Sequence, residues 1–224
     1  VEEKLMIPKI THKITNTLSL TQIENLNTDL LNESRKLYFS ELSKYTNINN
    51  NSCTIDKFPL NILHLPLINK IFPEGNYILA LRHPLDCILS CFMQNFKLNL
   101  AMANMLDIDQ IVKFYCLTME IFELCQKRYN LNVFKIRYED LIDNFENEVN
   151  SLLQFLNLNW EHGLVKFHLT AQKRKFISTP SYSQVIQPIY KDSSYKWKNY
   201  SQHLSKYFNI VEPWVRKHGY ESLK

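Results

Sequence analysis

The segment Asn76-Tyr-Ile-Leu-Ala-Leu-Arg-His-Pro-Leu-Asp-Cys-Ile-Leu-Ser90 constrains the fold of this chain more than any other. Its apolar run predicts a strand that ends at Arg82, and Pro84 suits the first turn of a helix, where a missing N–H costs nothing. Ser90 lies about two turns into that helix. A guanidinium and a hydroxyl placed in this way can close on one anion, such as a phosphate. The plainer interpretation is a strand–helix junction with a solvated arginine.

Hydrophobic periodicity predicts alternating helices and strands along the rest of the chain. Thr21-Gln-Ile-Glu24 has the form of a capping box, and the apolar spacing after it predicts one helix that continues to Leu42. The apolar run of the strand at 76–81 indicates that both faces of that strand are buried. The other expected elements are helices at 60–71, 107–129, 145–156, 193–207 and 212–217 and a strand at 132–138.

This order of strands and helices predicts an α/β fold with a central parallel sheet flanked by helices. We expect one domain over residues 1–224, because no linker or internal repeat divides the chain. The region from Thr170 to Pro188 has little periodicity and is expected to be a long loop. Loops of that length in compact domains are usually lids or binding segments.

Composition argues against several function classes. The net charge of +4 is mild and the basic residues are scattered, so a nucleic-acid partner is not expected. The five cysteines show no metal-ligand or disulfide spacing, which predicts buried thiols, a reducing cytoplasmic compartment and no metal site. No apolar run is long enough to span a membrane, and the first residues lack a signal-peptide pattern. The three glycines form no phosphate-binding loop, which disfavours ordinary dinucleotide or ATP binding.

Five segments, in one order along the chain, together resemble the sulfotransferases that use 3′-phosphoadenosine 5′-phosphosulfate (PAPS), in particular the tyrosylprotein sulfotransferases and their bacterial relatives. The step of eight residues from Arg82 to Ser90 is similar to the family's 3′-phosphate motif. The other four segments are Glu2-Glu-Lys-Leu-Met-Ile-Pro-Lys-Ile10, Asp56-Lys-Phe-Pro59, Arg137-Tyr-Glu-Asp-Leu141, and Ser181-Tyr-Ser-Gln-Val-Ile-Gln-Pro188 with Tyr195-Lys-Trp197.

The resemblance implies a P-loop NTPase-like sulfotransferase fold and a role for each matching residue. Glu3 would act as general base, Lys57 would neutralise the leaving oxygen, and Ser181 would donate to the sulfuryl or phosphate oxygens. The residues implied to bind the co-substrate are Arg82 and Ser90 at the 3′-phosphate, Tyr138 at the adenosine, and Lys196 at a phosphate. The same residues also have plainer interpretations, as solvated charges at Glu3, Lys57 and Lys196, a turn residue at Ser181, and core packing at Tyr138.

The resemblance therefore predicts transfer of a sulfuryl group from PAPS to the hydroxyl of a protein tyrosine, a carbohydrate or a small molecule, without a metal. The family's 5′-phosphosulfate loop is expected just ahead of Glu3 and is not in this sequence, so we expect an N-terminally truncated chain. Two alternatives stay open, namely a 3′-phosphoadenosine-nucleotide-binding fragment that does not catalyse transfer, and a nucleoside or small-molecule kinase with the same core architecture. The sequence does not determine the acceptor or the oligomeric state.

Overall fold

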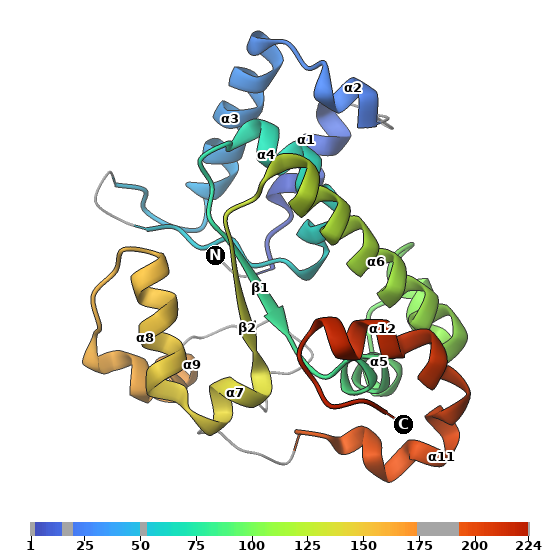
Figure 1. The fold of residues 1–224 in the computed structure, drawn as a ribbon. Coiled ribbons are helices and arrows are strands. Elements are labelled where there is room, and N and C mark those ends of the chain that lie inside the picture. Colours follow the sequence, from blue (N-terminus) through green and yellow to red (C-terminus); the bar gives the residue numbers. More distant parts are fainter. Residues whose placement is uncertain (1–2, 15–19, 50–52, 174–192, 224) are drawn as a thin grey trace. The chain divides into compact units, whose positions relative to one another are not determined.

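The computed structural model describes residues 3–14, 20–49, 53–173 and 193–223. The chain forms two compact units, one of Val1–Gly75 with Glu120–Asn132 and the other of Asn76–Met119 with Val133–Lys224. In chain order the elements are α1 (Met6–Ile14), α2 (Leu20–Glu24), α3 (Thr28–Leu42), η1 (Pro59–His64), α4 (Leu65–Ile71), β1 (Tyr77–Leu81), α5 (Pro84–Met93), η2 (Met102–Leu106), α6 (Ile108–Tyr129), β2 (Val133–Arg137), α7 (Tyr138–Asp143), α8 (Phe145–Phe155), η3 (His162–Lys166), α9 (Phe167–Lys173), η4 (Lys196–Tyr200), α11 (Ser201–Leu204), η5 (Ser205–Tyr207) and α12 (Phe208–Lys217), where η marks a 3₁₀ helix (Figure 1).

The first unit is helical, and its core lies between α1, α3 and α4. Apolar positions on α1 recur three or four residues apart, so they form one buried stripe that packs on α3. Tyr38 of α3 packs edge-on against Phe72, and its hydroxyl donates to Asp56 at 3.0 Å. The buried residues of this core are Met6, Ile7, Ile10, Tyr38, Leu42, Leu67 and Ile71.

The prediction of one helix from Thr21 to Leu42 is wrong. The structure has two helices, α2 and α3, with a break before Thr28. Asn27 causes the break, because its backbone is extended and its side chain accepts a hydrogen bond from the N–H of Leu30 at 2.9 Å. An asparagine that caps a new helix in this way competes with continuation of the preceding one. The expected helix at 60–71 is likewise divided into η1 and α4.

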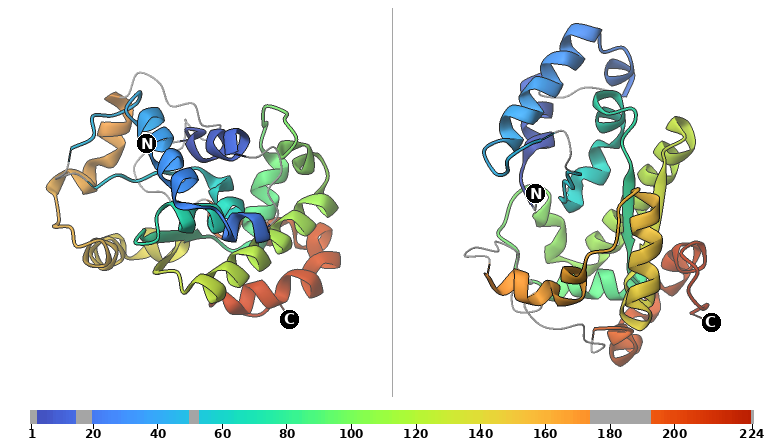
Figure 2. Two further views of the ribbon diagram at one scale, coloured as in Figure 1. Left: turned by 90° about the horizontal axis from the view of Figure 1, so that it is seen from above. Right: turned by 90° about the vertical axis from the view of Figure 1, so that its left-hand side faces the viewer.

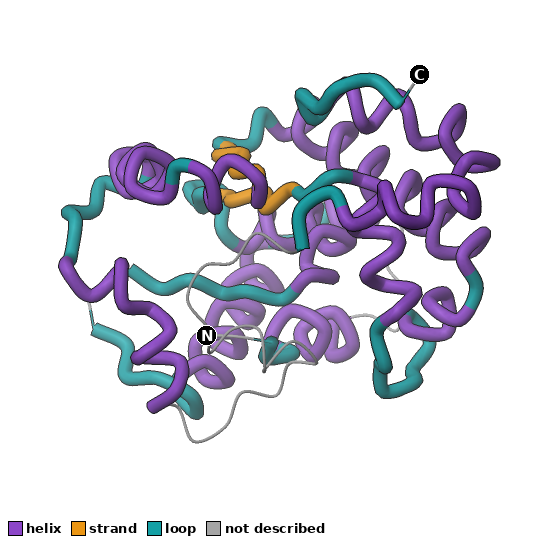
Figure 3. The backbone as a smooth tube through the Cα atoms, turned by 90° about the horizontal axis from the view of Figure 1, so that it is seen from below, coloured by secondary structure: helices purple, strands orange, loops and turns teal. Residues whose placement is uncertain are grey.

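The second unit is built around a parallel pair of strands. β1 pairs with β2 in the register Tyr77 to Val133 through Leu81 to Arg137. Figure 3 shows the two strands side by side among helices. Both strands and the long intervening helix α6 were predicted from periodicity and are confirmed, as is the α/β class. The sheet has two strands within the part of the chain that the structure describes.

The prediction that both faces of β1 are buried is wrong. Leu79 and Leu81 are buried, whereas Ile78 is 37% exposed and Ala80 is also exposed. Successive side chains of a strand point to opposite sides, so only the face that carries Leu79 and Leu81 is covered. A near-continuous apolar run therefore did not distinguish a strand buried on both faces from one buried on one face.

Helices α5 and α12 and the first half of α6 build the main core of the second unit. α12 packs on α5. Figure 2 shows the C-terminal helices, in red, from two further directions. The expected helix at 193–207 is three short pieces, η4, α11 and η5, which place Trp197, Leu204 and Tyr207 in this core. The buried residues are Leu85, Ile88, Leu89, Ile111, Val112, Trp197, Leu204, Tyr207, Val211, Val215 and Tyr220.

The region after Thr170, the cysteines and the apolar helices were also subjects of prediction. The region expected to be a loop from Thr170 begins as helix α9, which ends at Lys173, and residues 174–192 lie outside the described residues. All five cysteines are free thiols, but Cys53 is exposed, so the expectation that all of them are buried is wrong. No helix within the described ranges is both long enough and apolar enough to cross a membrane.

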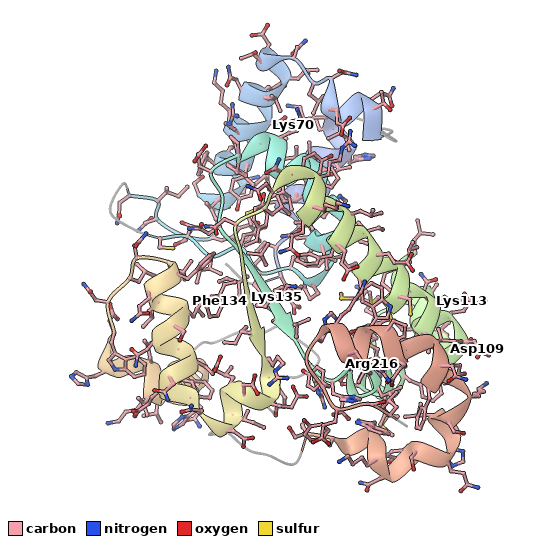
Figure 4. All side chains as sticks on the ribbon, in the orientation of Figure 1. Lys70, Asp109, Lys113, Phe134, Lys135 and Arg216 are labelled. Atoms are coloured by element: carbon pink, nitrogen blue, oxygen red, sulfur yellow. The ribbon has the colours of Figure 1, made fainter. Side chains whose placement is uncertain are left out.

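Glu212 provides a test of the packing at the C-terminal end of the second unit. Its carboxylate accepts hydrogen bonds from Ser222 at 2.6 Å, Arg216 at 2.7 Å and the N–H of Leu223 at 3.0 Å. Arg216 is labelled on α12 in Figure 4. Hydrogen bonds from Ser222, Arg216 and the N–H of Leu223 lower the pKa of Glu212 to about 2, from an ordinary value of 4.5.

A depressed carboxyl pKa stabilises the fold above the unfolded-state pKa, and this contribution is lost as the pH falls from about 4.5 toward 2. Glu212→Gln should therefore reduce the loss of unfolding free energy over this pH range. Urea denaturation followed by tryptophan fluorescence measures it, because all three tryptophans belong to the second unit. Ser222→Ala should reproduce part of the change. Parallel stability curves for wild type and Glu212→Gln would contradict the assignment.

Candidate functional site

Arg82 directly follows β1, where its guanidinium makes contacts to two other segments. Its Nη2 donates to the backbone carbonyl of Ser193, and its guanidinium lies over the ring of Tyr138 at 5.4 Å from the centroid. Its Nε is buried and has no hydrogen-bond partner among the residues described. Leaving a buried donor unsatisfied costs about 1–3 kcal/mol, so this position favours a ligand that offers an acceptor oxygen.

The backbone next to Arg82 is held by a buried carboxylate. Glu139, 4% exposed, accepts from the N–H of His83 at 2.9 Å with one oxygen and from the hydroxyl of Tyr220 at 2.6 Å with the other. Burial and the adjacent carboxylate of Glu139 raise the pKa of Tyr220, so this hydroxyl keeps its proton and remains a donor. Glu139 therefore ties the end of β2 to the β1–α5 junction and to the C-terminal segment.

The imidazole of His83 packs inside this junction and does not face solvent. It stacks on Trp197 with ring centroids 5.0 Å apart and 16° between the planes, and it meets Tyr220 edge-on. Burial lowers the pKa of His83 to about 4, and the positive charges of Lys198 and Arg82 act in the same direction. The ring is therefore neutral near pH 7 and contributes packing to the junction, not charge.

Asp86 connects the first turn of α5 to η4. It is 1% exposed, and its Oδ1 accepts from the N–H of Trp197 at 2.8 Å. Lys196 precedes Trp197 and is exposed. Trp197 itself is buried. The backbone next to Lys196, the candidate phosphate ligand, is thus held by a residue of α5.

The other predicted ligands of the second unit lie on the same elements. Ser90 is on α5, one helical turn beyond Asp86 and partly buried. Tyr138 begins α7, directly after β2, and its ring contacts Arg82. The guanidinium of Arg137 donates to both carboxylate oxygens of Asp140 and to the carbonyl of Gly219. The structure therefore brings Arg82 and Tyr138 together, whereas Arg137 forms an ion pair with Asp140.

Glu3 and Lys57, the two candidate catalytic residues of the first unit, are in direct contact. Lys57 Nζ donates to Glu3 Oε1 at 2.8 Å, and the N–H of Glu3 donates to the carbonyl of Lys57 at 2.6 Å. Glu3 has a φ of 53°, in the left-handed region that non-glycine residues seldom adopt. The sequence separation of these residues is 54, so tertiary structure creates the pair.

Ser181, the remaining predicted site residue, lies outside the described residues. Within the described ranges no group of three or more histidine, cysteine, aspartate or glutamate side chains is placed to hold a metal ion. Sequence reasoning missed Asp86 and Glu139, although both lie inside motifs that it had singled out. For Asp86 the available signal was an acidic residue within the otherwise apolar start of a helix, a pattern that indicates a carboxylate with a buried partner. Glu139 lies among other charged residues, so its segment gave no such signal.

Comparison with known proteins identifies the family of the chain. The model of the sulfotransferase family matches residues 4–162. An uncharacterized protein of Aquifex aeolicus (strain VF5) is 27% identical over 164 residues, which are 73% of this chain and 21% of that protein. Protein-tyrosine sulfotransferase A of Caenorhabditis elegans is 21% identical over 170 residues, which are 74% of this chain and 44% of that protein.

These matches cover most of this chain, and the chain spans less than half the length of both relatives. The region matched by the family model includes Lys57, the segment from Arg82 to Ser90, and Tyr138. Glu3 lies just before it, and Ser181 and Lys196 lie after it. Because the family model covers well over half of the 224 residues, the chain belongs to the sulfotransferase family.

Proposed function

We propose that this chain is part of a PAPS-dependent sulfotransferase that transfers a sulfuryl group to an acceptor hydroxyl, and that residues 1–224 form one sulfotransferase domain. The observation that carries this proposal is the environment of Arg82. A guanidinium at the end of β1, with a buried Nε that has no partner among the described residues, suits a phosphate oxygen. The family membership makes the 3′-phosphate of PAPS the natural candidate.

The other proposed ligands of the second unit would complete the binding of this nucleotide. Ser90 of α5 would donate its hydroxyl to the 3′-phosphate, and Tyr138 would lie against the adenosine while its ring also contacts Arg82. Lys196 would add a positive charge to a phosphate of the co-substrate. Ser181 would donate to the oxygens of the sulfuryl group or the leaving phosphate, as the family resemblance implies.

The pairing of Glu3 with Lys57 supports their proposed catalytic roles. In the reaction a bond forms between the acceptor oxygen and sulfur, and the bond between sulfur and the phosphate oxygen of PAPS breaks. Glu3 would take the acceptor proton, and Lys57 would stabilise the negative charge on the departing oxygen. An ammonium group has three N–H donors, so Lys57 can donate to Glu3 and to the leaving oxygen at the same time.

We further propose a peptide tyrosine as the acceptor class. The support is the similarity to protein-tyrosine sulfotransferase A of C. elegans, whose name states its acceptor. Transfer from ³⁵S-labelled PAPS tests this choice. The acceptors to compare are a tyrosine-containing acidic peptide, its phenylalanine counterpart and a hydroxylated sugar. Label in the sugar and not in the tyrosine peptide would assign a carbohydrate acceptor.

Arg82→Ala should weaken binding of 3′-phosphoadenosine 5′-phosphate about 10- to 100-fold, because one or two hydrogen bonds to a charged group are lost. Isothermal titration calorimetry of this nucleotide and of adenosine 5′-phosphate measures both the affinity and the preference for the 3′-phosphate. The variant should lose that preference. Arg128→Ala is the control, since Arg128 is an exposed arginine in an ion pair with Glu24. Equal affinity of wild type for the two nucleotides would contradict the proposal.

Glu3→Gln should lower the rate of sulfuryl transfer about 10²- to 10⁴-fold while the affinity for 3′-phosphoadenosine 5′-phosphate changes little, since a general base acts on the proton and not on the nucleotide. Lys57→Met should also lower the rate. Single-turnover transfer from ³⁵S-labelled PAPS measures the rates. Glu33→Gln is the control, because Glu33 forms an exposed ion pair with Lys13 in the same unit.

The outcome in wild type separates the proposal from its alternatives. Nucleotide binding without any transfer would favour a 3′-phosphoadenosine-nucleotide-binding fragment that is not catalytic. Full activity of Glu3→Gln would remove Glu3 from the mechanism and leave the family assignment intact. Tighter binding of ATP than of 3′-phosphoadenosine 5′-phosphate would favour the kinase alternative.

A further inference from the structure

Asp86 is a buried carboxylate that the proposed mechanism does not use. It lies in the first turn of α5 and is 1% exposed. Its Oδ1 accepts from the N–H of Trp197, whereas its Oδ2 is buried without a hydrogen-bond partner among the residues described. Burial raises the pKa of Asp86, against the opposing effects of the N–H of Trp197, the charge of Arg82 and the N–H of Tyr195. A carboxylate retained in so unfavourable a position calls for a specific role.

Asp86 and Arg82 hold the same segment of backbone at two points. Arg82 donates to the carbonyl of Ser193, and Asp86 accepts from the N–H of Trp197. Arg82 and Asp86 are four residues apart, and so are their partners Ser193 and Trp197. Residues 82–86 therefore hold both ends of residues 193–197. This double attachment joins parts of the chain that are 111 positions apart.

The backbone between the two attachment points is strained. Tyr195 has a φ of 53° and a ψ of 27°, in the left-handed region. A non-glycine residue remains there only when its surroundings hold it in place. The two hydrogen bonds on either side provide that restraint, and the stacking of Trp197 on His83 adds to it. The residue that follows this turn is Lys196.

We propose that Asp86 is a positioning residue that fixes the backbone of Lys196, so that its ammonium group can reach the phosphate of the bound nucleotide. This inference rests on the proposed function, because it needs Lys196 to contact the nucleotide. Asp86 itself makes no contact with the nucleotide in this role. It acts through the N–H of Trp197.

The sign of the effect distinguishes positioning from simple electrostatics. A carboxylate near a phosphate repels it, so loss of the negative charge alone would tighten nucleotide binding. Loss of the anchor would weaken binding, because the strained turn could relax and Lys196 would lose its position. Asp86→Asn removes the charge but keeps an acceptor oxygen for the N–H of Trp197. Asp86→Ala removes both.

The experiment measures binding of 3′-phosphoadenosine 5′-phosphate by calorimetry in wild type, Asp86→Ala, Asp86→Asn, Lys196→Ala and the double variant Asp86→Ala/Lys196→Ala. We expect Lys196→Ala to weaken binding about 3- to 30-fold, because the substitution removes a contact between charges that solvent partly screens. Asp86→Ala should cause a loss no larger than that of Lys196→Ala. The double variant should bind no more weakly than Lys196→Ala alone, and Asp86→Asn should stay close to wild type.

Hydrogen exchange gives a second measurement that does not need the nucleotide. In the free protein, Asp86→Ala should increase exchange in peptides that cover residues 193–204, whereas Asp86→Asn should not. Asp109→Ala is the matched control, because Asp109 also lies in the first turn of a helix of the second unit and accepts from Tyr207 at 2.6 Å. Figure 4 labels Asp109 on α6. This variant should leave nucleotide binding unchanged.

The outcomes separate this proposal from the proposed function. Absence of nucleotide binding in wild type would overturn both. If wild type and Asp86→Ala bind the nucleotide equally well, only the positioning role is overturned. The same holds if Lys196→Ala weakens binding equally in wild type and in Asp86→Ala. Tighter binding by both Asp86 variants would show that the carboxylate acts through its charge and would also overturn it.

Discussion

The carboxylate of Glu139 is the interaction on which the second unit depends most. A buried carboxylate is unfavourable unless its oxygens are satisfied, and here one accepts from the backbone of His83 and the other from the hydroxyl of Tyr220. These two hydrogen bonds join the end of β2, the start of α5 and the C-terminal segment. The junction that follows β1 is thereby fixed, and Arg82 is the residue at that junction.

The two arginines near this junction, Arg82 and Arg137, have different hydrogen-bond partners. Arg137 is committed to Asp140 and the carbonyl of Gly219 and so braces the C-terminal segment. Arg82 directly follows the neighbouring strand β1, one residue beyond the position that pairs with Arg137, and its buried Nε has no partner among the described residues. Arg82 and Arg137 therefore have different surroundings because of the partners that tertiary structure gives them, although both lie at the carboxyl ends of paired parallel strands.

The first unit uses a different kind of arrangement. Glu3 and Lys57 meet through one backbone hydrogen bond and one ion pair, which position the carboxylate and the ammonium relative to each other. Exposed ion pairs contribute little to stability, and Lys57 is 46% exposed at its side chain. A pair of this kind is better suited to a chemical role than to holding the fold together, which is consistent with the proposed roles in proton and sulfuryl transfer.

Periodicity was sufficient for elements with strong local signals. β1, α6, β2 and α8 were predicted because apolar spacing and the residues that flank it are local properties of the chain. The break before Thr28 was missed because the choice between one helix and two depended on a single asparagine cap. The exposed face of β1 was missed because an apolar run does not report how many elements cover a strand.

The sequence by itself determined the sulfotransferase family and the α/β class. It also predicted candidate site residues such as Arg82 and Ser90, which are close in the chain. Only the tertiary structure decided which residues support them. Asp86 with Trp197, Glu139 with Tyr220 and Glu3 with Lys57 are separated by 111, 81 and 54 positions. No local pattern encodes such partners, because a carboxylate can accept from any donor that the fold brings to it.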